Sequence, residues 1–426
     1  MATTVTNFDA ALKQIYSASN LAKTTLSRRP LLAMLPKRSD FGGRNMPIVN
    51  VYGDPQGRSA SFGNAQGTTG TAPANQVSVD DFLLTRVSNY SIAQVGSEAA
   101  EASKGDAMAF LQALKASIDG AMNSLSNSIE TQLFRCGTGV IGTVGAYVGG
   151  ATSFTLGEEE DVANFDVNMV IVASAADGGA LRTGTNAVSG VNRSTGVITS
   201  TAVWDSAITS FAPADFVYPQ GDAANNGSNV CISGLCSWLP STAPSGGESF
   251  FGVDRSVDSR LYGQYTDQAS ADIEDGLITA GSLSARVGGN PNVAFINHVQ
   301  QRALIQSLRG LAGATGFQGQ NYNTVNATTH KGVVADIGFR SVTIQGDTGA
   351  INVVAANKCP AESGYMLEMD KWILATLGEP VKFLNLDGNR ILRSATADSV
   401  EARLAFRGNL GCKAPIYNVR ILMPAV

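Results

Sequence analysis

The clearest hydrophobic pattern along the chain is a single apolar stripe between about Asp106 and Phe134. At 1.5 Å per residue, a helix over this range would be roughly 40 Å long, enough to brace a whole subunit. Gly120 lies inside the pattern at a cost of about 1 kcal/mol relative to alanine. The apolar positions recur every three or four residues and predict one amphipathic helix; they are Leu111, Leu114, Ile118, Met122, Leu125, Ile129 and Leu133.

The segment before this stripe predicts a long hairpin. Met46–Tyr52 has the pattern of a short strand, and Asp81–Val95 that of a second, longer strand. Between them, Gly53–Gln76 is rich in Gly, Ser, Thr, Ala and Gln and has little apolar content. A two-stranded hairpin is at best marginally stable by itself in water. We therefore expect this hairpin to need a surface on which to lie.

A second amphipathic helix is predicted close to the N-terminus. Asn7 can cap it, and its apolar face comprises Phe8, Ala11, Leu12, Ile15 and Tyr16. Residues 1–45 contain seven basic and two acidic residues, a net charge of +5, which leaves −10 for the rest of the chain. We expect a basic arm that is tied down by something other than its own subunit.

Beyond the long helix, residues 144–222 change to short β runs separated by Gly-rich turns, which predicts a small inserted β module. Its expected strands are Phe165–Ala173, Val188–Val191, Val197–Thr201 and Phe216–Tyr218. The remainder alternates between strands and helices, and no internal repeat is visible. Its expected elements are strands at Val293–Ile296, Val333–Val334, Val342–Ile344, Ile351–Ala355, Val400–Phe406 and Ile416–Met423, a helix capped by Asn297 and ending at Leu308, and a short helix at Asp370–Leu377, which the segment Met366–Met369 precedes.

The low charge of the chain bears on its partners. Only 15% of residues are charged, against roughly 25% in ordinary soluble proteins, and 44% are hydrophobic. Burial against partner subunits is the simplest way to hide such a surface, although a compact Gly-rich β protein remains an alternative. The net charge of −5 argues against dedicated nucleic-acid binding. The sequence has no apolar run of membrane-spanning length and no pattern of a secretory signal, so we expect no membrane.

The five cysteines are odd in number and scattered, and we expect reduced, mostly buried thiols at Cys136, Cys231, Cys236, Cys359 and Cys412. Cys231 and Cys236 could form half of a metal site, but zinc needs about four ligands and no second pair accompanies them.

An enzyme function finds little support in the sequence. Gly137–Gly142 has the glycine spacing of a dinucleotide loop, but a helix precedes it and none is predicted to follow, so we expect it to end the long helix. The two histidines, His298 and His330, have no matching catalytic motif. Glu158–Asp161 is more typical of a solvated acidic loop than of a cation site. We expect no catalytic, cofactor-binding or metal-binding residue.

The order of the elements points further. A basic helical arm, a polar-tipped hairpin, a long helix and a mixed α/β remainder that ends in strands together resemble the major capsid proteins of tailed bacteriophages, the HK-97-like fold family. Three sequence phrases also look like phage capsid sequences: Phe250–Arg255, Tyr365–Trp372 and Leu404–Arg420. The stretch Val170–Tyr218 is similar to a β insertion found in some members.

The resemblance implies an α+β fold with the parts of that family. These are an N-terminal arm (1–45), an extended E-loop hairpin (46–96), the spine helix of the P-domain (97–142), an inserted β-rich domain (143–222), a continuation of the P-domain (223–265), an A-domain (266–365) and C-terminal P-domain strands (366–426). Some members carry a long N-terminal scaffolding segment, whereas only 45 residues precede the hairpin here.

The function implied by the resemblance is that of a major capsid protein that self-assembles into the icosahedral shell around the phage genome. The implied partners are copies of the chain in hexamers and pentamers, a separate scaffolding protein, a portal and, as a further candidate, a decoration protein. Double-stranded DNA would be enclosed without sequence-specific binding. The implied location is the virion, after assembly in the bacterial cytoplasm. Another phage structural β protein, such as a decoration or tail-tube subunit, is the alternative.

Overall fold

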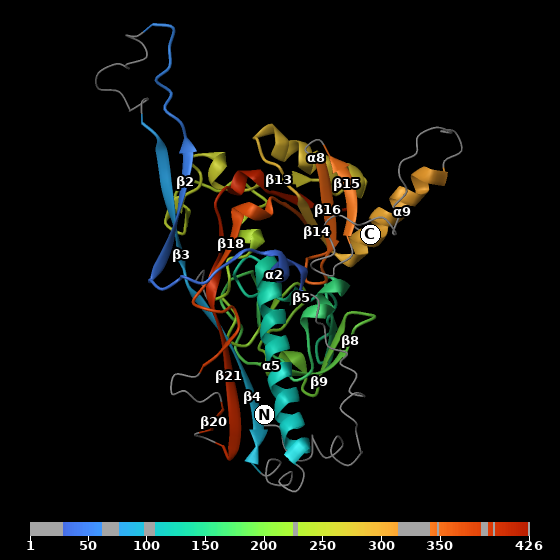
Figure 1. Cartoon of the computed structure of the whole chain (residues 1–426). Coiled ribbons are helices and arrows are strands. Elements are labelled where there is room, and N and C mark those ends of the chain that lie inside the picture. Colours follow the sequence, from blue (N-terminus) through green and yellow to red (C-terminus); the bar gives the residue numbers. More distant parts are fainter. Residues whose placement is uncertain are drawn as a thin grey trace.

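The computed structural model describes residues 29–61, 76–97, 107–224, 229–313, 341–346, 349–384, 391–394 and 397–424. Figure 1 shows a body braced by one long helix, with a two-stranded hairpin that extends away from it at one end. The predicted helix over residues 7–16, much of the expected hairpin tip and the expected strand Val333–Val334 lie outside the described residues.

The long helix α5 (Ala107–Phe134) confirms the prediction from the apolar stripe. Leu125, Ile129 and Leu133 are buried, so this face of the helix packs on the body. Figure 1 shows α5 running alongside the strands β4 and β21. Gly120 lies on the exposed side, where a methyl group would meet no atom within 4 Å. The cost of this glycine is therefore not offset by close packing within the subunit.

The predicted hairpin is present, but its second strand is shorter than expected. β2 (Asn45–Gly53) and β3 (Ser78–Thr85) pair antiparallel, with Ile48 opposite Phe82. The run expected from Asp81 to Val95 breaks at Arg86, and β4 (Val87–Gly96) pairs with a different strand. The Arg86 side chain donates to the carbonyl oxygen of Phe41 at 3.0 Å, and this contact holds the break between the two strands.

One six-stranded sheet is organised around β21 (Ser399–Cys412), which confirms and lengthens the strand predicted at Val400–Phe406. Residues 399–408 of β21 pair with β4, and residues 408–412 pair with β18 (Trp372–Thr376). The remaining short strands are β1 (Lys37–Arg38), parallel to β18, and β19 (Lys382–Phe383) and β20 (Leu392–Arg393), which pair with β21.

The short helix predicted over Asp370–Leu377 is wrong. A 3₁₀ turn, η4 (Met369–Lys371), leads directly into strand β18. All five residues of β18 are buried, because the strand lies between β1 and β21 inside the body. A fully buried strand is a continuous apolar run, and its periodicity does not distinguish it from a buried helix.

A second six-stranded sheet has the order β13–β22–β17–β14–β16–β15 and confirms most of the predicted strands in this region. The helices α8 (Ile273–Arg286) and α9 (His298–Gly313) accompany it. Asn297 caps α9 as predicted, with Oδ1 accepting from the Val299 amide at 3.2 Å. The strands are β13 (Gln264–Asp267), β14 (Val293–Ile296), β15 (Ser341–Gly346), β16 (Gly349–Ala355), β17 (Ser363–Leu367) and β22 (Val419–Leu422).

The third six-stranded sheet lies within residues 142–219 and has its own apolar core, in which the rings of Phe154, Trp204 and Phe211 contact one another. The strand predicted at Phe165–Ala173 begins only at Val170. A 3₁₀ helix, η2 (Glu159–Asn164), and the positive φ of Asn168 (70°) precede it. In sheet order, the strands are β5 (Gly142–Thr143), β10 (Phe216–Pro219), β7 (Val170–Ser174), β8 (Asn186–Asn192), β9 (Val197–Ser200) and β6 (Ser153–Thr155).

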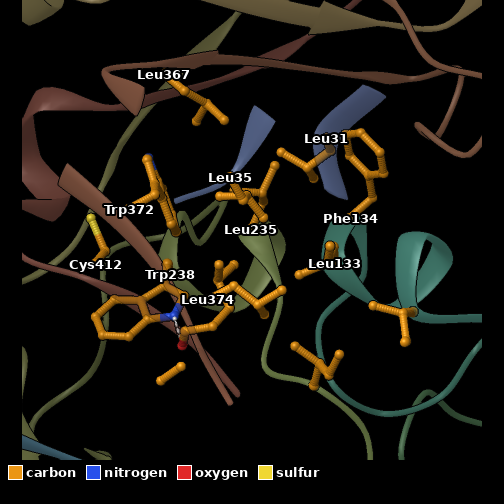
Figure 2. Packing of buried hydrophobic residues seen from close by; sticks show 14 of the residues in the cluster. Leu31, Leu35, Leu133, Phe134, Leu235, Trp238, Leu367, Trp372, Leu374 and Cys412 are labelled. Carbon is orange, nitrogen blue, oxygen red and sulfur yellow. Dashed lines mark hydrogen bonds between the residues drawn. The ribbon is translucent and has the colours of Figure 1, made fainter. Parts of the chain in front are cut away.

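A large apolar cluster joins the hairpin and the long helix to the sheets that contain β21 and β14. Figure 2 shows part of this cluster, around Leu133, Trp238 and Trp372. The ring of Trp238 lies near the ring of Trp372, and its Nε1 donates to the carbonyl oxygen of Leu410 at 3.2 Å. The smaller elements are α2 (Pro30–Met34), α6 (Trp204–Ala207), α7 (Leu235–Trp238), β11 (Ser249–Phe250), β12 (Val253–Asp254), η3 (Ser259–Leu261) and η5 (Pro415–Tyr417). In the described ranges, no helix has the length and apolar character needed to cross a membrane.

Candidate interaction surface

The hairpin presents apolar side chains on both faces. On one face, Ile48 and Phe82 are buried against the body. On the other face, Val49 and Val51 are 59% and 56% exposed. We call this second face the hairpin outer face; its residues are Pro47, Val49, Val51, Val79, Asp81 and Leu83, which pair across the strands as Pro47–Leu83, Val49–Asp81 and Val51–Val79. Side chains alternate along a strand, so the apolar side chains of β2 and β3 that point away from the body stay exposed unless a partner covers that face.

The base of the hairpin is fixed to the body. The ring of Phe82 contacts the ring of Trp238 with centroids 5.1 Å apart, and the amide of Leu83 donates to the carbonyl oxygen of Phe251 at 2.8 Å. Beyond Gly53, residues 54–61 form no strand and are mostly exposed. The hairpin therefore has two parts. The core holds its stem rigidly, whereas the described body gives residues 54–61 little support.

A second exposed apolar face lies on the long ladder between β4 and β21. Tyr90 and Ile92 are 54% and 57% exposed, and they lie opposite Ala405 and Arg403. The guanidinium of Arg407 lies 5.8 Å from the centre of the Tyr90 ring. The opposite face of this ladder packs on α5. We call the exposed side the ladder outer face; it combines two large apolar side chains with two cations.

The point at which the N-terminal segment reaches the body is held by the long helix. Both carboxylate oxygens of Glu130 accept backbone hydrogen bonds, from the amides of Leu31 at 3.0 Å and Leu32 at 2.8 Å. Arg29 donates to the side-chain oxygens of Asn123 and Asn127, both at 2.9 Å. Burial raises the pKa of Glu130 to about 7, although the two amides and Arg29 oppose this rise. This polar cluster fixes the first described residues of the chain to α5.

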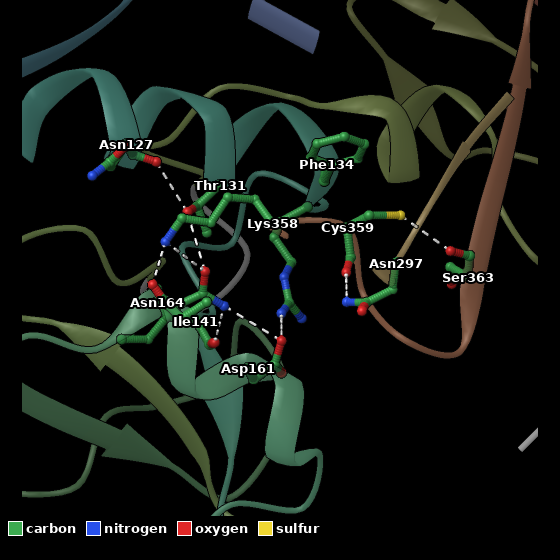
Figure 3. Close-up of polar contacts among 12 residues, drawn as sticks. Asn127, Thr131, Phe134, Ile141, Asp161, Asn164, Asn297, Lys358, Cys359 and Ser363 are labelled. Atoms are coloured by element: carbon green, nitrogen blue, oxygen red, sulfur yellow. Dashed lines mark hydrogen bonds and ion pairs between the residues drawn. The ribbon is translucent and has the colours of Figure 1, made fainter. Parts of the chain in front are cut away.

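A polar junction attaches the sheet of residues 142–219 to the rest of the molecule (Figure 3). Arg135, just after α5, forms an ion pair with Asp161. Lys358 donates to Oδ1 of Asn164 at 3.2 Å, and Asn164 donates to the carbonyl oxygen of Ile141 at 2.8 Å. Burial lowers the pKa of Lys358 to about 8 and raises the pKa of Asp161.

The expectation of a solvated acidic loop at Glu158–Asp161 needs correction. Asp161 is buried in its ion pair with Arg135 and is not a solvated carboxylate. Burial and the neighbouring carboxyl group of Glu362 raise the pKa of Glu158 to about 7. Glu158–Asp161 thus belongs to the junction between the sheet of residues 142–219 and the rest of the molecule. No local sequence pattern indicates this contact.

The expectation of five reduced thiols is wrong for two of them. Cys136 and Cys236 form a disulfide with their Cα atoms 4.7 Å apart, across 100 residues of sequence. Cys231, Cys359 and Cys412 are free and buried, as predicted. No sequence pattern indicates the pairing, because only the fold brings the end of α5 next to α7. The bond also leaves Cys236 unable to share a metal site with Cys231.

The structure describes two of the three remaining chemical candidates, Gly137–Gly142 and His298. Helix α5 ends at Phe134, Gly137 and Gly139 have positive φ, and a strand follows, so Gly137–Gly142 terminates a helix and is not a dinucleotide loop. His298 is exposed at the start of α9, and His330 lies outside the described residues. Among the residues that the structure describes, no group of three or more His, Cys, Asp or Glu side chains could hold a metal ion.

No protein-family model matches the chain, and no curated protein matches it either. Solved structures do match over nearly its whole length. A chain of the cyanophage A-1(L) capsid asymmetric unit is 13% identical, with a TM-score of 0.51 over 97% of this chain and 98% of that one. A chain of the native GTA particle capsid is 8% identical (TM-score 0.45, 99% of both chains), and one from Mycobacterium phage Bobi is 10% identical (TM-score 0.43, 100% of both). The cyanophage similarity identifies the fold: this chain shares the α+β fold of a phage capsid chain.

Proposed function

We propose that this chain is the major capsid protein of a tailed bacteriophage and that it assembles with copies of itself into an icosahedral shell around the genome. The observation that carries the proposal is the hairpin outer face. Its stem is fixed to the core through Phe82, while Val49 and Val51 on the other face are more than half exposed. A subunit that stays alone leaves these apolar side chains in contact with water, whereas a shell subunit covers them with a neighbour.

The energies involved suit assembly from many copies. Fully burying a Val or Leu side chain stabilises by about 1.5–3 kcal/mol relative to leaving it exposed, before the costs of association. Four such side chains lie on the outer face: Val49, Val51, Val79 and Leu83. Each contact is modest, but every subunit of a closed shell repeats it, so small energies add up to a stable particle.

We assign the parts of the subunit by analogy with the capsid fold. Residues 1–45 are the N-terminal arm, and residues 46–85 are the E-loop hairpin, which is shorter than the range expected from the sequence because β4 pairs with β21. Helix α5 with β4 and β21 forms the P-domain, and the sheet that contains β14 and β17 forms the A-domain. Residues 142–219 form an inserted β domain with its own apolar core.

The proposed partners follow from this assignment. Copies of the chain associate as hexamers and pentamers, guided by a separate scaffolding protein and closed at one vertex by a portal; a decoration protein is a further candidate. DNA is enclosed without sequence-specific contacts, in keeping with a net charge of −5. Assembly takes place in the bacterial cytoplasm, and the mature protein resides in the virion. A decoration or tail-tube subunit is the alternative, and the combination of the hairpin with the 28-residue helix α5 argues against it.

Electron microscopy and light scattering of the expressed chain, alone and with the neighbouring phage genes, test the proposal. We expect hexamers, pentamers or closed shells. The double variant V49D/V51D should remain folded but fail to assemble, because charged groups cannot be buried at the contact. Val148 is 77% exposed on the inserted β domain, and V148D is the matched control that should still assemble. A wild-type chain that stays monomeric under all these conditions would contradict the proposal.

A further inference from the structure

The disulfide lies at the neck of the inserted β domain. Cys136 follows the end of α5 and Cys236 lies in α7, so the bond joins the points at which the chain leaves the body and returns to it. The two chain segments are in close contact at this crossing. A Cβ atom at Gly234 would lie within 2.5 Å of the carbonyl oxygens of Gln132, Leu133 and Arg135, and only glycine fits there. The Ser237 hydroxyl donates to the carbonyl oxygen of Cys136 at 2.7 Å.

The two bonded cysteines differ from the other three in accessibility. Cys136 and Cys236 are half-buried and line a cavity of about 240 Å³. Cys231, Cys359 and Cys412 are buried, and burial raises the pKa of each of these thiols. Thiolates, not thiols, carry out exchange reactions. A small reagent in solution can therefore reach this pair while the other cysteines stay unreactive.

One cation lies directly beside the sulfur of Cys236 and favours a thiolate there. Arg420 projects from β22, and its Nη1 lies 3.4 Å from the sulfur of Cys236. Its Nη2 donates to the Ser363 hydroxyl at 3.2 Å, which fixes the guanidinium in place. Arg135 lines the same cavity but is paired with Asp161, and the carboxyl groups of Glu158, Asp177 and Glu362 line it as well, so Arg420 is the cation that acts on the sulfur. A fixed positive charge stabilises a neighbouring thiolate, so Cys236 is the better nucleophile in the reduced pair and the better leaving group in the oxidised pair.

We propose that Cys136 and Cys236 form a thiol–disulfide exchange pair that clasps the neck of the inserted β domain, with Cys236 as the attacking cysteine and a small disulfide such as oxidised glutathione as the oxidant. The Cys236 thiolate attacks one sulfur of the glutathione disulfide, which forms a mixed disulfide at Cys236 and releases one glutathione thiolate. Cys136 loses its proton to solvent and attacks the sulfur of Cys236. The Cys136–Cys236 bond forms and the second glutathione leaves as its thiolate; two protein thiols are oxidised and one glutathione disulfide is reduced.

The disulfide joins the two ends of the neck covalently, whereas the ion pair of Arg135 with Asp161 does not. Because the bond links the two ends of the neck, it encloses residues 137–235 in a covalent ring. In a reducing compartment this ring is open, and in an oxidising medium it is closed. The clasp therefore responds to the redox state of the surroundings, independently of whether the chain assembles into a shell.

Trapping of the mixed disulfide tests the proposal. The full chain is reduced, freed of reductant and mixed with oxidised glutathione, and the adducts are located by peptide mass spectrometry after acid quenching. In C136S, glutathione should accumulate on Cys236. In C236S, glutathione should modify Cys136 at least about threefold more slowly. A difference of this order is expected when one thiol is more fully ionised but, as a thiolate, is intrinsically the weaker nucleophile. Equal or faster modification of Cys136, or no adduct in either variant together with no disulfide in the wild type, would overturn the proposal.

The role of Arg420 is tested in the same C136S background. R420Q should slow adduct formation at Cys236, while R420K, which keeps the positive charge, should restore most of the rate. A purely structural Arg420 would instead change the thermal unfolding temperature and leave the rate on the folded chain unchanged. Should the serine variants fail to fold, the wild-type chain quenched early in oxidation provides the same information, since the transient adduct must appear on Cys236 before it appears on Cys136.

Discussion

Glu130 on the long helix and Leu32 in the short helix α2 are joined by a hydrogen bond of 2.8 Å from the Leu32 amide to the buried carboxylate. The other carboxylate oxygen of Glu130 accepts from the amide of Leu31. The first turn of a helix has amide groups without partners inside the helix, and here a side chain 98 residues away supplies the acceptors. A residue of α5 therefore caps α2 and holds the start of the described chain.

This cap predicts a dependence of stability on pH. Burial raises the pKa of Glu130 from 4.5 to about 7, so the folded chain binds a proton that the unfolded chain has already released between these values. The contribution of Glu130 to the free energy of unfolding is therefore largest below about pH 4.5. It falls by up to about 3 kcal/mol as the pH rises to about 7. Asp222, with a pKa raised to about 6 by burial, acts in the same direction.

Urea denaturation of the unassembled chain between pH 5 and pH 8 measures this effect. The urea concentration at the midpoint of unfolding should fall with rising pH in the wild type. In E130Q this dependence on pH should be weaker, because a glutamine side chain cannot ionise. E159Q, at the exposed position within the acidic cluster Glu158–Asp161, is the matched control and should keep the wild-type slope. An unchanged slope in E130Q would show that another group is responsible.

A second prediction concerns the glycine in the middle of the long helix. Gly120 is exposed, and a methyl group at this position would meet no neighbouring atom. G120A should therefore stabilise the monomer by about 0.5–1 kcal/mol, through reduced flexibility of the unfolded chain and better helix propensity. Thermal unfolding would show the gain as a higher melting temperature. The reverse control is A121G at the neighbouring buried position, which should lower the melting temperature. A G120A chain that melts at or below the wild-type temperature would contradict the prediction.

Sequence reasoning predicts those parts of the fold that rest on local periodicity. The apolar stripe of α5 needs only a 3.6-residue repeat, and its predicted end at Phe134 agrees with the structure. The same reasoning misses β18, because burial on both faces removes the alternation that distinguishes a strand. The cap of α2 by Glu130 and the bond between Cys136 and Cys236 join residues about a hundred positions apart, so no local pattern could reveal them.

A third prediction concerns the energetic value of the disulfide. Closing a loop of about 100 residues reduces the entropy of the unfolded chain and is worth up to about 4.7 kcal/mol. C136S/C236S should therefore lower the stability of the oxidised protein and should match the stability of the reduced wild type. Thermal unfolding with and without reductant measures the difference. C231S removes a buried free cysteine and keeps the disulfide, so this control should lose stability on reduction as the wild type does, whereas C136S/C236S should not respond to reductant.

The last prediction contrasts two adjacent residues on one strand of the hairpin. Phe82 is fully buried against Trp238, and Leu83 is 40% exposed on the hairpin outer face. F82A should cost about 3–5 kcal/mol of monomer stability, because it leaves a cavity in the core. L83D changes a surface position and should leave monomer stability within about 0.5 kcal/mol of the wild type, but it should block assembly by placing a charge at the contact. Denaturation of the monomer and electron microscopy of the assemblies separate the two effects. If L83D forms normal shells, the outer face is not an assembly contact; if it unfolds the monomer, that face belongs to the subunit's own core.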